Sequence, residues 1–121
     1  MNALASDYSH GYGNNPVRSD RDTEYAMLSR VTSMLRRASA SGDIRVQIEA
    51  VGKNNQLWTI LAADLASEGN ALPDDLRARL LSLASFSLRH GHAVLVRKAT
   101  VNALIDVNMS IMKGLRGEAG A

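Results

Sequence analysis

Apolar residues recur every three or four positions along most of this chain, which is the spacing of one face of an α-helix. The first helix is expected to begin near Asp22 or Thr23 and to end within residues 39–42. A second helix is expected from about Asp43 to Ser67. The apolar face of the first helix consists of Tyr25, Leu28, Val31 or Thr32, and Leu35.

Two more helices follow in the second half of the chain. Pro73 suits the first position of a helix that would end near Lys98, although Gly91 favours a kink or an early end. A final helix is expected from about Thr100 to Leu115, and its inward face is expected to consist of Val101, Leu104, Ile105, Asn108, Ile111, Met112 and Leu115. β-branched runs are absent, so the expected fold is all-α, a small helical bundle of about four helices. The apolar face of the third helix is expected to consist of Leu76, Leu80, Leu83, Leu88 and Val94.

The first twenty-one residues differ from the rest. Glycine and asparagine occupy four of the five positions 11–15, and Pro16 follows them. Such a cluster interrupts regular structure, so residues 1–21 are expected to be a short helix or a mobile, loop-rich segment. Residues 22–117 are expected to form one helical domain, because a chain of 121 residues has room for a single core.

Two asparagines lie within apolar helix faces. Asn55 shares a face with Ile48, Val51 and Trp58, and Asn108 occupies the centre of the last helix. Burying a carboxamide costs free energy unless it is hydrogen-bonded, so such residues fix the register of helices or contact a partner. We predict that Asn108→Leu keeps the helical content, leaves stability unchanged or raises it, and weakens partner binding. Trp58 is either a core anchor or an interface anchor.

Composition restricts the class of protein. The chain has no cysteine, which excludes disulfides and thiol catalysis. Its apolar runs are far shorter than the ~20 residues that cross a bilayer, and no basic start with an apolar run marks it for secretion. We therefore expect a cytoplasmic protein without membrane insertion.

Catalytic and metal-binding patterns are not recognisable. His90 and His92 would diverge by roughly 200 degrees on a helix, and no nearby carboxylate completes a metal site. Asp106 lies beside the apolar face of the last helix rather than in a catalytic arrangement. Phosphate-binding glycine loops and nucleophile motifs are also missing. We expect no enzyme activity, no metal and no cofactor.

Charge is distributed unevenly, although the net charge is only +2. No acidic residue occurs from Leu76 to Ile105. This stretch is either a face for RNA or an acidic partner, or a solvated helix surface. The lack of interleaved aromatic residues favours the solvated surface. Its candidate basic face consists of Arg77, Arg79, Arg89, Arg97 and Lys98.

Four short phrases occur in a characteristic order. They lie at residues 55–58, 70–78, 104–108 and 114–116, and they include Asn55-Gln56-Leu57-Trp58 and Leu104-Ile105-Asp106-Val107-Asn108. In order and spacing they resemble the FlaF family of flagellar biosynthesis regulators. The resemblance extends over roughly residues 22–116.

This resemblance implies a small cytoplasmic helical protein that acts on the synthesis and export of flagellin. The implied partners are flagellin and FlbT, a companion regulator of flagellin messenger RNA. The first hypothesis is a flagellin-binding secretion chaperone or adaptor, since unassembled flagellin exposes amphipathic helices that a helical groove would cover. Candidate partner-binding residues are Asn55, Leu57, Trp58, Leu72, Pro73, Asp106, Asn108 and Met112.

Two alternatives remain open. The chain could regulate flagellin expression after transcription, contacting RNA directly through the basic stretch or only through an FlbT-like protein. It could also be a scaffold whose apolar faces pair with copies of itself. RNA binding would weaken steeply with added salt, whereas capture of an apolar helix would change little.

Overall fold

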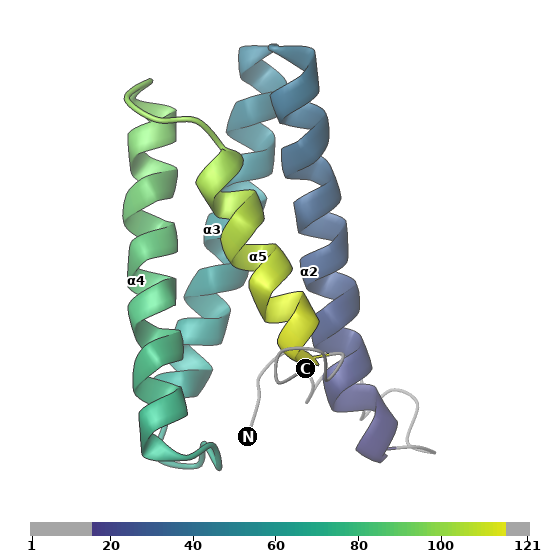
Figure 1. The fold of residues 1–121 in the computed structure, drawn as a ribbon, viewed down its shortest axis with the longest axis vertical. Helices are drawn as coiled ribbons and strands as arrows, with labels where there is room; N and C mark the ends of the chain where they lie inside the picture. Colours follow the sequence, from purple (N-terminus) through teal and green to yellow (C-terminus); the bar gives the residue numbers. More distant parts are fainter. Residues whose placement is uncertain (1–15, 116–121) are drawn as a thin grey trace.

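The computed structural model describes residues 16–115, and the side chains of residues 22–115 (Figure 1). This part of the chain contains no strand, which confirms the all-α class and the small bundle of about four helices. The helices are α2 (Pro16–Ser41), α3 (Ile44–Ala66), α4 (Asp74–Leu95) and α5 (Asn102–Leu115).

The first helix begins earlier than the sequence indicated. α2 starts at Pro16 rather than near Asp22, so residues 16–21, expected to belong to the N-terminal segment, are part of the first long helix. Pro16 does not end the segment rich in glycine and asparagine. It occupies the first position of α2, where its missing N–H costs nothing. The expectation for residues 1–15 lies outside the described residues.

The turn between α2 and α3 follows ordinary capping rules. Gly42 has a φ of 67°, the left-handed conformation in which glycine avoids the cost of a side chain. Asp43 then caps α3 by accepting a hydrogen bond from the Arg45 N–H at 2.9 Å. The predicted start of the second helix is therefore confirmed.

α4 continues through Gly91 without interruption, so the predicted kink or early end is wrong. It ends at Leu95 rather than near Lys98. Arg97, at a φ of 64°, takes the left-handed position of a Schellman motif. The Arg97 N–H donates to Val94 O at 3.0 Å, and the Lys98 N–H donates to Ala93 O at 2.8 Å.

The buried face of α4 also differs from the predicted one. Three small residues, Ala84, Ser87 and Gly91, lie fully inside together with Val94. Leu76 is 39% exposed, and the other predicted leucines, Leu80, Leu83 and Leu88, are only half-buried. Small side chains allow two helix backbones to approach closely, and α4 makes its most extensive contact with α3.

The four helices alternate in direction, but α5 is not aligned with the others. In Figure 1, α5 begins beside the C-terminal end of α4 and crosses diagonally toward α2. It packs extensively on α2 and only lightly on α4, and its backbone does not come close to α3. The N-terminal half of α4 therefore packs on α3 without cover from α5.

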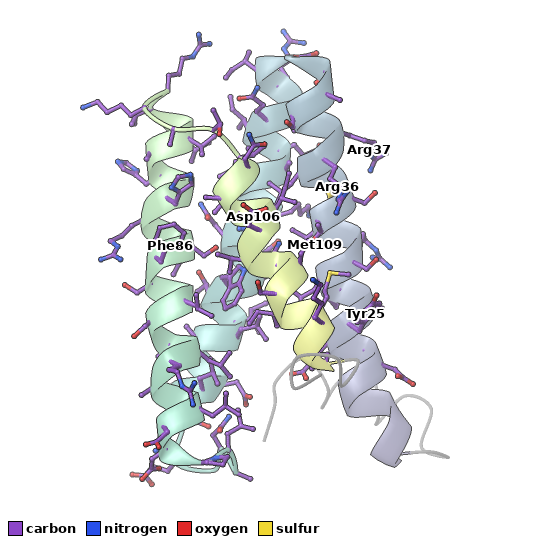
Figure 2. All side chains as sticks on the ribbon, viewed as in Figure 1. Tyr25, Arg36, Arg37, Phe86, Asp106 and Met109 are labelled. Carbon is purple, nitrogen blue, oxygen red and sulfur yellow. The ribbon has the colours of Figure 1, made fainter. Side chains whose placement is uncertain are left out.

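The main core lies between α2, α3 and α5. The predicted faces of α2 and α5 are confirmed, because Leu28, Leu35 and Leu104 are all at most 1% exposed. Arg36 reaches over this core from α2 and places its Nη2 3.1 Å from Met109 Sδ on α5 (Figure 2). The buried apolar residues of this core are Leu28, Val31, Leu35, Ala38, Ala50, Val51, Leu57, Val94, Val101, Leu104 and Met112.

Candidate functional site

A chain of polar side chains crosses the interior of the bundle. The Trp58 Nε1–H donates to Asn108 Oδ1 at 2.9 Å, and Asn108 Nδ2 donates to Asn54 Oδ1 at 2.8 Å. Asn54 Nδ2 in turn donates to Ser87 Oγ at 3.2 Å. All four residues are at most 1% exposed. Because each bond satisfies a buried donor, this polar chain avoids the desolvation cost of unpaired groups.

The polar chain connects α5 to α3 and α4. The backbone of α5 packs only lightly on α4 and does not come close to α3. Asn108 comes from α5, Trp58 and Asn54 from α3, and Ser87 from α4. Since the backbones of α3 and α5 do not meet, these long side chains span the gap between them. A slip of α5 along its axis would break the bonds of Asn108. Asn108 and Trp58 therefore act on the register of the helices.

The sequence pointed to the wrong asparagine in α3. Asn54 is fully buried, whereas Asn55 is only half-buried and Ile48, assigned to the same face, is 51% exposed. The buried face runs through Val51, Asn54 and Trp58, at the spacing of three and four residues that an inward face requires. Because Asn54 and Asn55 are neighbours of the same residue type, the sequence does not show which of them faces the core.

Asn55 has a separate role against α4. A Cβ added to Gly91 would collide with Asn55 Oδ1, so the two helices meet where Gly91 has no side chain. Among the described residues, this buried Oδ1 has no hydrogen-bond partner. Asn55 therefore lies in a close contact between α3 and α4 and does not form part of an exposed binding surface.

The candidate partner-binding residues do not form one surface. Leu57, Trp58, Asn108 and Met112 are buried. Leu72 and Pro73 are exposed in the turn before α4, and Asp106 is exposed on α5 (Figure 2). Among these residues, only those in the turn and Asp106 are exposed on the folded molecule.

The structure also shows an apolar surface that combines Leu72, a candidate partner-binding residue, with leucines of the predicted core face of α4. We call Leu72, Leu76, Leu80 and Leu83 the leucine stripe. Leu72 and Leu76 are 37% and 39% exposed, and Leu80 and Leu83 are half-buried. From Leu76 on, the stripe continues the face that α4 buries farther along, and it stays open because α5 has crossed toward α2 (Figure 1).

Phe86 is a further exposed apolar side chain on α4, about 60° around the helix from Leu83. It is 36% exposed and stacks on His90, with ring centroids 5.4 Å apart (Figure 2). In the described part of the chain, five of the six exposed large apolar residues lie between Leu72 and Val96. They are spread from the turn before α4 to its C-terminal cap, and the leucine stripe is the part in which apolar side chains adjoin one another, as in a surface that binds a partner.

Hydrogen bonds hold the start of the leucine stripe in place. Asn70 accepts the Leu72 N–H at 3.1 Å and donates to Asp64 O at 3.2 Å. Asp64 is 7% exposed, and its Oδ1 has no hydrogen-bond partner among the residues described. The α3–α4 turn therefore presents Leu72 in a fixed position beside α4.

The basic residues are spread over the whole length of α4. Arg77 pairs with Asp74 at 3.0 Å, one helical turn away. No ion pair to any described residue is formed by Arg79, Arg89, Arg97 or Lys98. They extend over about 25 Å of helix, so they form two groups at the ends of α4 rather than one cluster.

Other features of residues 22–115 do not assemble a reactive centre. His90 Nε2 lies 2.8 Å from Thr100 O and so joins α4 to the following loop. No three potential metal ligands gather within the described region. An open hollow of about 570 Å³ between α2 and α3 has both apolar and charged walls, formed by Met34, Arg37, Ala40, Ser41, Val46 and Glu49. None of the described helices is long and apolar enough to cross a membrane.

Fold and surface together define a class: a small helical protein whose described part, a bundle of four helices, leaves an apolar face of one helix uncovered. The chain belongs to the family described as "Flagellar protein FlaF", whose model matches residues 6–115. The resemblance read from the sequence is thereby confirmed, and the protein is a flagellar one. No curated protein and no solved structure matches this chain.

Proposed function

We propose that this protein is a secretion chaperone or adaptor that binds flagellin in the cytoplasm and promotes its synthesis and export. Membership of the FlaF family supports a flagellar role. The observation that carries the proposal is the leucine stripe, an apolar helix face left open by the diagonal path of α5. An amphipathic helix of unassembled flagellin would complete the bundle at this place.

The size of the leucine stripe limits its own share of the affinity for a helix. From Leu76 to Leu83, α4 extends about 10 Å, which is about two helical turns. Each partly exposed leucine would gain roughly 0.5–1 kcal/mol on full burial, a third of the value for a fully exposed side chain. The four leucines would thus contribute about 2–4 kcal/mol, and the apolar side chains of the flagellin helix would contribute the rest of the affinity.

The proposal predicts that polar substitution of the leucine stripe abolishes binding without unfolding the protein. Leu72→Asp combined with Leu76→Asp places two charges at the positions where the partner helix would pack. We expect at least a tenfold loss of affinity for flagellin, measured by isothermal titration calorimetry, because unpaired charges would be buried in the complex. Circular dichroism should show unchanged helical content, since both side chains are already exposed.

Ile48→Asp is the matched control. Ile48 is 51% exposed, and it lies in the first turns of α3 rather than on α4. This variant should bind flagellin as the unmodified protein does. An equal loss in the control, or full binding by the double variant, would contradict the role of the leucine stripe.

The partner helix also has an alternative source in a second copy of this chain. Self-association through the leucine stripe would appear in light scattering as a mass that rises with protein concentration. The double variant would then be a monomer, and flagellin binding would not depend on Leu72 or Leu76. An FlbT-like regulator is proposed as a further partner, with no surface assigned to it.

RNA contact is the second candidate function. Its supporting observation is that Arg79 and Arg89 make no ion pair with any described residue. Because the basic side chains are spread along α4, each would contact a different phosphate. RNA binding through them would weaken steeply with added salt, whereas flagellin capture by the leucine stripe would not.

A further inference from the structure

The C-terminal end of α4 combines apolar and cationic side chains on one exposed tip. Leu95 and Val96 are 39% and 47% exposed, and Arg97 and Lys98 follow them directly, both exposed. Neither cation forms an ion pair with a residue in the described part of the chain. We call residues 95–98 the α4 tip.

Backbone hydrogen bonds fix the shape of the α4 tip. The N–H groups of Arg97 and Lys98 donate back to Val94 O and Ala93 O at 3.0 and 2.8 Å. Thr100 O lies 2.8 Å from His90 Nε2, which ties the loop beyond the tip to α4. A surface that is already ordered loses little conformational entropy on binding.

The chain on both sides of the α4 tip is basic or neutral in sequence. No acidic residue occurs from Leu76 to Ile105, and the last two turns of α4 carry Arg89 and His92, both exposed. Any negatively charged partner would therefore meet no repulsion from this part of the chain. In Figure 1 the tip and its loop lie beyond the start of α5, at the same end of the molecule as the turn between α2 and α3.

We propose that the α4 tip is a peripheral anchor for an anionic lipid bilayer, independent of flagellin binding. Two neighbouring cations would lie at the lipid phosphates while Val96 and Leu95 enter the interfacial layer. RNA would bind the two cations but leave the side chains of Leu95 and Val96 in water. A lipid surface would contact all four side chains of the tip.

The α4 tip and the leucine stripe are far enough apart to be occupied together. The stripe ends at Leu83 and the tip begins at Leu95, so about 18 Å of helix lies between them. The protein would therefore hold its apolar face away from the membrane while the opposite end of α4 rests on it. No helix is inserted in this arrangement.

Vesicle co-sedimentation tests the anchor. The full-length protein should bind vesicles of phosphatidylcholine and phosphatidylglycerol, should not bind phosphatidylcholine alone, and should dissociate as salt is added. Arg97→Asn combined with Lys98→Gln should weaken binding by about 30-fold, corresponding to the loss of two basic residues near an anionic surface. Asparagine tolerates the left-handed conformation at position 97, so the tip keeps its shape. Val96→Asn should also reduce binding.

Lys53→Gln combined with Lys113→Gln is the matched control, because both lysines are exposed and lie on α3 and α5. This control removes the same charge and should retain vesicle binding. The proposal is overturned if the tip variant binds as well as the control, if neutral vesicles bind equally, or if no vesicle binds. Binding of a short RNA or an acidic peptide through Arg97 and Lys98 without vesicle binding would overturn it as well.

Discussion

Asn108 is the residue on which the position of α5 depends most. Replacing it with leucine removes the acceptor of the Trp58 N–H and the donor to Asn54 Oδ1, and both groups are buried. We expect Asn108→Leu to destabilise the protein by about 1–3 kcal/mol, the cost of leaving buried polar groups unpaired. Denaturant titration measures this loss, and the fluorescence of Trp58, the only tryptophan, reports the local change.

Gln56→Leu is the control, since it replaces an exposed carboxamide on α3 and should change stability by less than about 0.5 kcal/mol. Asn108→Leu without loss of stability would contradict the structural role. The sequence identified Asn108 as an exception in an apolar face but led to the opposite expectation for its replacement. Its partners were not predictable, because Asn54 and Trp58 are more than forty positions away.

At the scale of the element, α4 depends on the absence of a side chain at Gly91. A methyl group there would collide with Asn55 Oδ1, so the Asn55 side chain would have to move within the contact of α3 with α4. We expect Gly91→Ala to destabilise the protein by about 1–3 kcal/mol, despite alanine's higher helix propensity. Thermal unfolding followed by circular dichroism checks the sign.

A second glycine provides the comparison. Gly52 lies within α3, and an added Cβ would have no atom within 4 Å. Gly52→Ala should therefore stabilise the protein by up to about 1 kcal/mol. Adding Asn55→Ala to Gly91→Ala should recover part of the lost stability, because the colliding carboxamide is removed. If Gly91→Ala stabilises the protein as Gly52→Ala does, the close contact does not exist.

α2, α4 and α5 show which buried helix faces can be predicted from the sequence. α2 and α5 bury large side chains such as Leu35 and Leu104, so apolar spacing identified their inner faces correctly. α4 buries Ala84, Ser87 and Gly91 and leaves its leucines at the margin. A pattern based on residue size selects leucine over glycine. It therefore failed where close backbone approach, rather than apolar volume, decides which face is buried.

At the scale of the molecule, the candidate site results from the direction of one helix. Had α5 run parallel to α4, it would have covered the leucine stripe, but it crosses to α2 (Figure 1). The apolar spacing within α4 or α5 does not predict the direction in which α5 crosses the bundle. Contacts between helices set this direction, such as that of Thr32 on α2 with Met112 on α5. The sequence therefore predicted four helices and the family, and it did not predict which apolar face remains open.

An open face of this kind also couples binding to stability. A flagellin helix on the leucine stripe would bind the folded chain and not the unfolded one, so it must raise the unfolding temperature. At a ligand concentration 100 times the dissociation constant, the stabilisation should be about 2.7 kcal/mol. For a domain of this size each kcal/mol corresponds to about 4 °C or more, which differential scanning fluorimetry detects. The Leu72→Asp, Leu76→Asp variant should show no shift while Ile48→Asp shows the full shift. An unchanged unfolding temperature with saturating flagellin would mean that flagellin does not bind the leucine stripe.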